Sequence, residues 1–94
     1  MRVGLLVIEL FLPGCASLKD KRRVVRSLLE GARARHNVAT AEVDFQDLHQ
    51  RAQLAFASVA DSDAPLERLF DRILEEAERA APGGVSEIAR DILG

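Results

Sequence analysis

A nearly continuous run of apolar residues near the start of the chain is the feature that most constrains its fold. The run extends from Val3 to Leu12, contains one charged residue, Glu9, and ends at the turn signal Pro13-Gly14. Both of its faces are apolar and its length suits a strand, so we expect a β-strand covered on both sides or nearly so. The run is too short and too charged to span a membrane, and no small-residue cleavage site follows it. We therefore expect a soluble, cytosolic protein.

Two segments have the periodicity of amphipathic helices. The first begins at Ser17, which with Asp20 resembles a capping box, and six of its apolar residues fall within an arc of about 140°: Leu18, Val24, Val25, Leu28, Leu29 and Ala32. The second follows the capping residues and proline at 61–65 and ends at 82–84, Pro-Gly-Gly. Its apolar residues have the spacing i, i+3, i+4, i+7, i+8, i+11: Leu66, Leu69, Phe70, Ile73, Leu74 and Ala77.

The segment between the two helices predicts a β-hairpin. From Val38 to Phe45 the chain alternates with a period of two, which places Ala39, Ala41, Val43 and Phe45 on the core face and Thr40, Glu42 and Asp44 on the other. From Arg51 to Ala60 a second strand would turn Leu54 and Phe56 to the core and Arg51, Gln53 and Ala55 away from it. The short polar link between the two strands favours a hairpin.

Residues 85–93 are ambiguous, because their apolar positions have helical spacing although the segment is short and follows Gly-Gly. We predict a closing strand, since a strand there would shield an edge of the sheet. The resulting order β-α-β-β-α-β is the ferredoxin-like arrangement, an α+β fold in which two helices cover one face of a four-stranded antiparallel sheet. We expect residues 1–94 to form one such domain, with the first strand in a central position.

The charge of the chain is divided unevenly along its length. The net charge of −2 combines an excess of three positive charges in residues 1–53 with an excess of five negative charges in residues 54–94. Two differently charged surfaces are therefore expected. Cys15 is the one cysteine, so no internal disulfide can form, which fits a reducing compartment.

The cationic side of the first helix is the best candidate binding surface. On a helical wheel, five cations lie within an arc of about 100°, with Glu30 the one acid among them: Lys19, Arg22, Arg23, Arg26 and Arg33. Such a surface can contact the phosphates of RNA, because Lys and Arg release counterions from a polyanion. Two alternatives stay open: the cations face solvent, or they pair with an acidic flank of the second helix at Glu67, Asp71 and Glu78.

The exposed face of the sheet argues against base stacking of the kind that RNA-recognition motifs use, because it would carry one aromatic residue and three carboxylates. The residues expected to point outward are Leu5, Val7, Glu9, Phe11, Val38, Thr40, Glu42, Asp44, Gln53, Ala55, Ala57 and Val59. Soluble monomers rarely leave such an apolar area open. We therefore hypothesise that a second copy of the chain covers this face, through Leu5, Val7, Phe11, Glu42, Asp44 and Arg51.

The hairpin also gathers titratable residues, namely Glu42, Asp44, Asp47, His49 and Arg51, with Glu9 alongside. Such a set could hold a divalent metal or perform acid–base chemistry, but a cross-strand ion pair of Arg51 with Asp44 or Glu42 is a simpler interpretation. Acylphosphatases share the order of elements, yet their loop after the first strand needs several glycines and an arginine, and residues 13–17 have one glycine and no arginine. We expect Cys15 to be an incidental small residue, and we expect no catalysis and no cofactor.

Three segments resemble the YlxP-like family of small bacterial proteins of unknown function: Val-Gly-Leu-Leu-Val-Ile-Glu-Leu-Phe-Leu-Pro at 3–13, Ser-Leu-Lys-Asp-Lys-Arg-Arg-Val-Val-Arg-Ser-Leu at 17–28, and Ala-Glu-Val-Asp-Phe-Gln-Asp-Leu-His-Gln-Arg-Ala at 41–52. The family often has His where Phe45 stands and an aromatic residue where His49 stands. The resemblance implies the ferredoxin-like fold, a closing strand and a bacterial source with genes among translation factors. Our expectation is an RNA- or ribosome-associated accessory module that is not an enzyme, or else a protein-interaction or homo-oligomerisation module.

Overall fold

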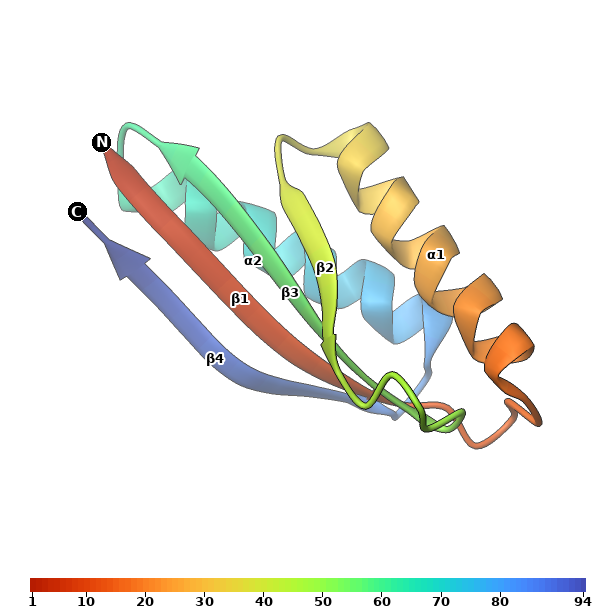
Figure 1. Ribbon diagram of the computed structural model, residues 1–94. Coiled ribbons are helices and arrows are strands. Elements are labelled where there is room, and N and C mark those ends of the chain that lie inside the picture. The colour runs from red at the N-terminus through yellow and green to blue at the C-terminus, as the bar shows by residue number, and fades with distance from the viewer.

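The computed structural model describes residues 1–94 and has the predicted order of elements. The strands are β1 (Arg2–Phe11), β2 (Ala39–Asp44), β3 (Arg51–Ala60) and β4 (Val85–Leu93), and the helices are α1 (Leu18–Arg35) and α2 (Asp63–Ala80). All neighbouring strands are antiparallel and the sheet order is β2-β3-β1-β4, so β1 is central as expected. The four strands lie in front of α2 in Figure 1, with α1 at the side of β2. The α+β, ferredoxin-like prediction is confirmed.

The core lies between the sheet and the two helices. β1 contributes Leu6, Ile8 and Leu10, which are fully buried, and β3 contributes Leu54 and Phe56. The helices cover these residues with the apolar side chains that their spacing predicted: Val25, Leu28, Leu29, Ala32, Leu66, Phe70, Ile73 and Ala77. α1 begins at its predicted cap, where Ser17 Oγ accepts a hydrogen bond of 3.1 Å from the backbone N–H of Asp20. No helix is both long enough and apolar enough to cross a membrane.

Residues 85–93 form the predicted closing strand, and an extra residue explains their helical spacing. Ile8 of β1 pairs with Glu87 whereas Val7 pairs with Ala89, so Ile88 is left over as a bulge. The bulge shifts the two-residue alternation halfway along β4, and an interrupted alternation imitates the three- and four-residue spacing of a helix.

The face prediction for β2 was wrong. Glu42 pairs with Leu54 and Thr40 pairs with Phe56, and residues directly opposite one another share a side of the sheet. Because Leu54 and Phe56 are buried, Thr40 and Glu42 turn toward the helices, and Val38 also packs against the core. The two alanines expected in the core, Ala39 and Ala41, lie on the open face instead. Asp44 is on the open face as predicted, because a bulge at Val43 shifts the register before Asp44 pairs with Gln53.

Candidate nucleic-acid interface

Four cations of α1 form an exposed surface without acidic partners, which we call the basic face: Lys19, Arg22, Arg23 and Arg26. None of them lies within 4.0 Å of a carboxylate oxygen, and none donates a side-chain hydrogen bond to the protein. Together with Ser27 and Glu30 they line a shallow depression of about 530 Å³. Arg33, the fifth predicted cation, differs because its Nη1 donates to Thr40 Oγ1 on β2. The basic face is therefore shorter than the sequence predicted.

The acidic residues of α2 do not neutralise the basic face. Glu67 and Asp71 instead accept hydrogen bonds from Arg90 of β4, at 3.4 and 3.0 Å. Glu78 accepts a hydrogen bond of 2.6 Å from the backbone N–H of Gly83, in the turn after α2. The alternative in which these three acids pair with the cations of α1 is therefore wrong. Each acid has its own partner within the second half of the chain.

One carboxylate of α2 does reach α1, at the end of the helix remote from the basic face. Glu76 Oε1 accepts from Arg35 Nη2 at 2.7 Å, and its Oε2 lies 2.7 Å from His36 Nε2. Burial by itself would raise the pKa of Glu76, but the hydrogen bonds and charges of His36 and Arg35 outweigh burial and lower this pKa below its ordinary value. Glu76 is thus a buried anion that joins the C-terminal end of α1 to α2.

The lowered pKa of Glu76 predicts a pH-dependent contribution to stability. In the unfolded chain this carboxyl titrates near its ordinary value of 4.5, whereas the folded protein holds it ionised to lower pH. Its contribution is therefore fully present above pH of about 4.5 and is lost as the pH falls further. We expect Glu76→Gln to lower the free energy of unfolding at pH 7 and to lower it by less at pH 3, measured by urea denaturation. A difference between the two proteins that stays constant with pH would contradict this assignment.

Unlike the exposed Lys19, the other lysine of α1, Lys21, is buried, and the sequence did not predict this. Lys21 has a relative exposure of 1% and extends under the link between β2 and β3. Its Nζ lies 2.7 Å from the carbonyl oxygen of Phe45, 3.3 Å from that of Gln46 and 3.2 Å from that of Arg51. A fourth oxygen, Glu42 Oε2, lies 2.9 Å from the same nitrogen. Because an ammonium has three hydrogens, the three carbonyls take the directed hydrogen bonds and Glu42 Oε2, which is inaccessible to water, is held by charge.

This lysine accounts for the unusual backbone of the hairpin. Phe45 has a φ of 62°, which is uncommon for a residue other than glycine. That conformation turns the Phe45 carbonyl toward Lys21 Nζ, and the neighbouring Gln46 carbonyl points to the same atom. The signal was present in the sequence: at 100° per residue, position 21 lies near the middle of the apolar arc of the helix. A lysine there must either be buried with acceptors or disrupt the core.

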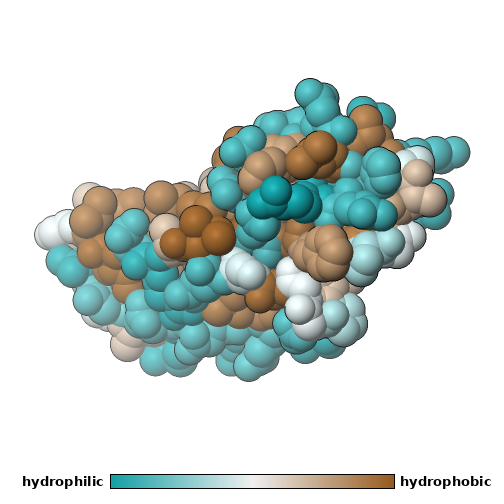
Figure 2. Space-filling model, turned by 90° about the horizontal axis from the view of Figure 1, so that it is seen from below, coloured by the Kyte–Doolittle hydropathy of each residue, from teal (hydrophilic) through white to brown (hydrophobic).

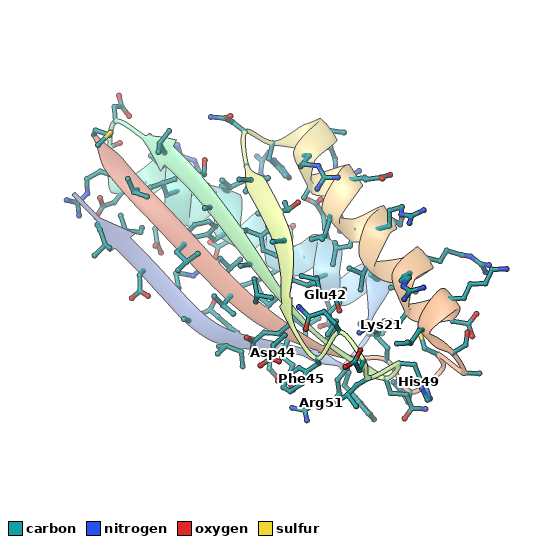
Figure 3. All side chains as sticks on the ribbon, viewed as in Figure 1. Lys21, Glu42, Asp44, Phe45, His49 and Arg51 are labelled. Atoms are coloured by element: carbon teal, nitrogen blue, oxygen red, sulfur yellow. The ribbon has the colours of Figure 1, made fainter.

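The titratable residues of the hairpin do not form a metal or acid–base cluster. No group of three or more His, Cys, Asp and Glu side chains is arranged to hold a metal ion. Figure 3 shows the labelled residues gathered at one end of the sheet, but their carboxylates do not converge: Glu42 pairs with Lys21, whereas Asp44 Oδ1 accepts from the backbone N–H of Phe45. Arg51 pairs with Glu9 at 3.0 Å and stacks over the Phe45 ring at 4.1 Å, so the predicted pairing with Asp44 or Glu42 was wrong. His49 and Asp47 are exposed in the link, and Cys15 is buried.

The open face of the sheet is apolar at one end and polar at the other. Its exposed apolar residues lie where the termini meet, and Figure 2, which views the molecule from below, shows hydrophobic residues along the upper left border. The polar end holds Glu9, Arg51 and Asp44, with Phe11 beside them. Val3 is paired with both Val59 and Leu93, so side chains from three strands adjoin. The large exposed residues of the apolar end are Val3, Leu5, Val59 and Leu93. Of the interface residues predicted from the sequence, Glu42 is not on this face.

Comparisons with known proteins identify relatives and the fold. A family model described as "Protein of unknown function (DUF503)" matches residues 3–90. The "Uncharacterized protein YlxP" of Bacillus subtilis (strain 168) is 31% identical over 72 residues, which cover 77% of this chain and 78% of that protein. Among solved structures, a de novo designed protein with a ferredoxin fold, determined by solution NMR, matches with a TM-score of 0.60 and 10% identity. That match covers 98% of this chain and 80% of the designed protein, and at this identity it concerns the fold alone.

Proposed function

This chain belongs to the DUF503 family of proteins of unknown function, and we propose that it is a non-catalytic accessory protein that binds RNA, free or within the ribosome, through the basic face of α1. The proposal places the protein in the bacterial cytoplasm. The observation that carries it is the absence of any acidic partner for Lys19, Arg22, Arg23 and Arg26.

The arrangement of these cations is unfavourable for the isolated protein. Lys19 is three residues from Arg22 and four from Arg23, and Arg26 is three and four residues from the same two arginines. Each such like-charge pair on a helix costs about 0.2–0.5 kcal/mol. The chain keeps four mutually repelling cations while Glu67, Asp71 and Glu76 of α2 pair with other cations. A polyanion would relieve this repulsion and release its own counterions on binding.

The sheet supports the choice of the helix as the RNA-binding surface. RNA-recognition motifs stack bases on aromatic residues of their central strands. Here the central strands β1 and β3 present Phe11 as their one aromatic side chain on the open face, and it lies next to the ion pair of Glu9 and Arg51. Asp44 and Asp91 add further negative charge to that face. Phosphates are therefore better accommodated on α1.

A salt titration tests the proposed function. The affinity for a short RNA labelled with a fluorophore is measured by anisotropy at several salt concentrations from about 50 to 200 mM. If four phosphates are neutralised, the logarithm of the association constant falls against the logarithm of the salt concentration with a slope of about −3, since each phosphate contributes about −0.7 to −0.9. Absence of binding at the lowest salt concentration, or affinity that does not depend on salt, would refute the proposal.

The open sheet face favours a second function, homo-oligomerisation. Val59 and Leu93 are 53% and 67% exposed, and they adjoin Val3 and Leu5. Monomeric proteins rarely expose a contiguous apolar area made by several strands. A second copy could place the same patch against it, because a two-fold interface is self-complementary. Such an interface leaves the basic face free, since the helices lie on the other side of the sheet.

We expect light scattering at micromolar concentration to give a mass above that of the 10.3 kDa monomer. Leu5→Glu should restore the monomer, because it places a second carboxylate in the apolar end, opposite Asp91 of β4. Leu48→Glu is the matched control: this leucine is 45% exposed in the β2–β3 link, against 39% for Leu5, and its replacement should leave the mass unchanged. A monomeric mass for the unsubstituted protein would contradict this second function.

A further inference from the structure

A second depression adjoins the basic face at the N-terminal end of α1. Its volume is about 460 Å³, within the range of about 300–1,000 Å³ that is typical of small-molecule sites. The walls come from three segments that are distant in sequence: the loop after β1, the first two turns of α1 and the end of α2 with its turn. The hydrophobic lining residues are Phe11, Leu12, Cys15, Val24, Ala80 and Ala81. We call this depression the apolar pocket.

Arg23 joins the apolar pocket to the basic face. It lines the apolar pocket, the depression of the basic face and a third groove of about 650 Å³ between the two helices. The third groove also contains Arg79, which has no carboxylate partner, and the ion pair of Arg35 with Glu76. The cations are thus placed around the opening of a largely apolar pocket and not over a flat surface.

The apolar pocket also contains a carboxylate with spare acceptor capacity. Asp20 Oδ2 accepts a hydrogen bond of 3.0 Å from the backbone N–H of Ala16, which fixes the side chain at the start of the helix. Its other oxygen, Oδ1, accepts no hydrogen bond from the protein. A ligand in this pocket would therefore meet apolar walls, one acceptor oxygen and a guanidinium at the opening.

We propose that the apolar pocket holds one unstacked base of a single-stranded RNA whose neighbouring phosphates lie on the basic face. A base has apolar faces for the walls and N–H donors on its edge for Asp20, and the phosphate attached to it is suited to Arg23. Bases that are stacked and paired in a duplex cannot enter the pocket, so the protein should prefer single-stranded to double-stranded RNA. This inference rests on the proposed function and adds the class of RNA to it.

The test compares a probe that has bases with one that has none. The affinities of a short single-stranded RNA and of inorganic polyphosphate are measured by calorimetry, at equal salt concentration, for the unsubstituted protein and for Ala80→Leu. Ala80 is exposed at the pocket wall, so the larger side chain should fill the pocket without disturbing the core. Loss of one base contact is worth about 1–3 kcal/mol, so we expect the RNA affinity to fall about tenfold. The polyphosphate affinity should not change.

The matched control is Ala64→Leu, the same substitution at an exposed position near the other end of α2. It should change neither affinity. If Ala80→Leu weakens neither ligand, or weakens both equally, the base pocket is refuted while the phosphate contact of the basic face stands. If the unsubstituted protein binds neither RNA nor polyphosphate, the proposed function itself is refuted, and the pocket assignment with it.

Discussion

Lys21→Met is expected to destabilise the protein by about 3 kcal/mol. Removing one partner of a buried ion pair typically costs about 3–5 kcal/mol, and here the substitution also removes the Nζ donor from the carbonyl oxygens of Gln46 and Arg51. The Phe45 carbonyl loses the same donor but keeps its hydrogen bond from the backbone N–H of Leu48. The lower end of the range applies because the Glu42 side chain is 21% exposed and can turn toward water. A domain of this size has a total stability of about 5–14 kcal/mol, so the loss is a large fraction of it. Urea denaturation measures it directly.

Two further variants distinguish the buried contact from a general effect of lost charge. Lys19→Met removes the same charge two residues away on the exposed basic face, and we expect it to change the unfolding free energy by less than about 0.5 kcal/mol. Adding Glu42→Gln to Lys21→Met should recover part of the stability, because it removes the unpaired buried charge. Equal urea midpoints for Lys19→Met and Lys21→Met would show that Nζ is not held by the hairpin in solution.

The double substitution Arg22→Glu with Arg26→Glu is expected to weaken RNA binding by at least about a hundredfold. Each arginine would lose a charge-assisted contact with phosphate worth about 1.5–3 kcal/mol, and the introduced carboxylates would repel the RNA. The slope of affinity against salt should also become shallower by about 1.5, since two phosphates are no longer neutralised. Both side chains are exposed and neither forms an ion pair, so the variant should fold normally.

The chain offers a close control in α2. Arg68 and Arg72 have the same four-residue spacing, are exposed and also lack a carboxylate partner. Each Arg→Glu substitution lowers the charge by two, so both double variants change the net charge from −2 to −6. Arg68→Glu with Arg72→Glu should therefore retain most of the affinity if binding is local to α1. Equal losses in the two double variants would show that RNA responds to net charge and not to the basic face.

Every element of the fold except β4 could be predicted from a clear local pattern. The apolar run of β1, the spacing of Leu66 to Ala77 and the capping pair Ser17 and Asp20 all occur where the structure has the corresponding strand, helix and helix start. The strand at 85–93 was predicted from the order of the other elements, because its own pattern is obscured by the bulge at Ile88. Local spacing and the need to close the sheet together were sufficient for the topology.

The orientation of β2 could not be predicted from its own alternation. Ala39 and Ala41 are more apolar than Thr40 and Glu42, so a pattern of hydrophobicity places the alanines inside. The structure does the opposite because Lys21 of α1 supplies a buried positive partner for Glu42, and Thr40 accepts from Arg33. These contacts join residues 21 positions and seven positions apart, and neither is visible within the strand. The one sequence feature that could have predicted this orientation is Lys21, which lies in the apolar arc of α1 and therefore needs a buried partner.

The candidate surface was predicted in part. The four cations from Lys19 to Arg26 are where the helical wheel placed them, but which acids would pair with them depended on β4. Arg90 of β4 forms ion pairs with Glu67 and Asp71, and Glu78 accepts a hydrogen bond from the turn after α2. These three acids therefore do not pair with the cations of α1. The apolar pocket was not predicted at all, because its walls come from both ends of the chain and meet only in the folded protein.

Mapping the RNA contact by NMR tests the central claim most directly. Amide chemical shifts of the ¹⁵N-labelled protein are recorded during titration with a short single-stranded RNA at low salt. We predict that the largest changes fall on α1 between Lys19 and Ser27, while Leu5 and Val59, at the apolar end of the open face, keep their shifts. Changes concentrated on the sheet face instead, around Leu5 and Val59, would contradict the assignment of RNA binding to the basic face.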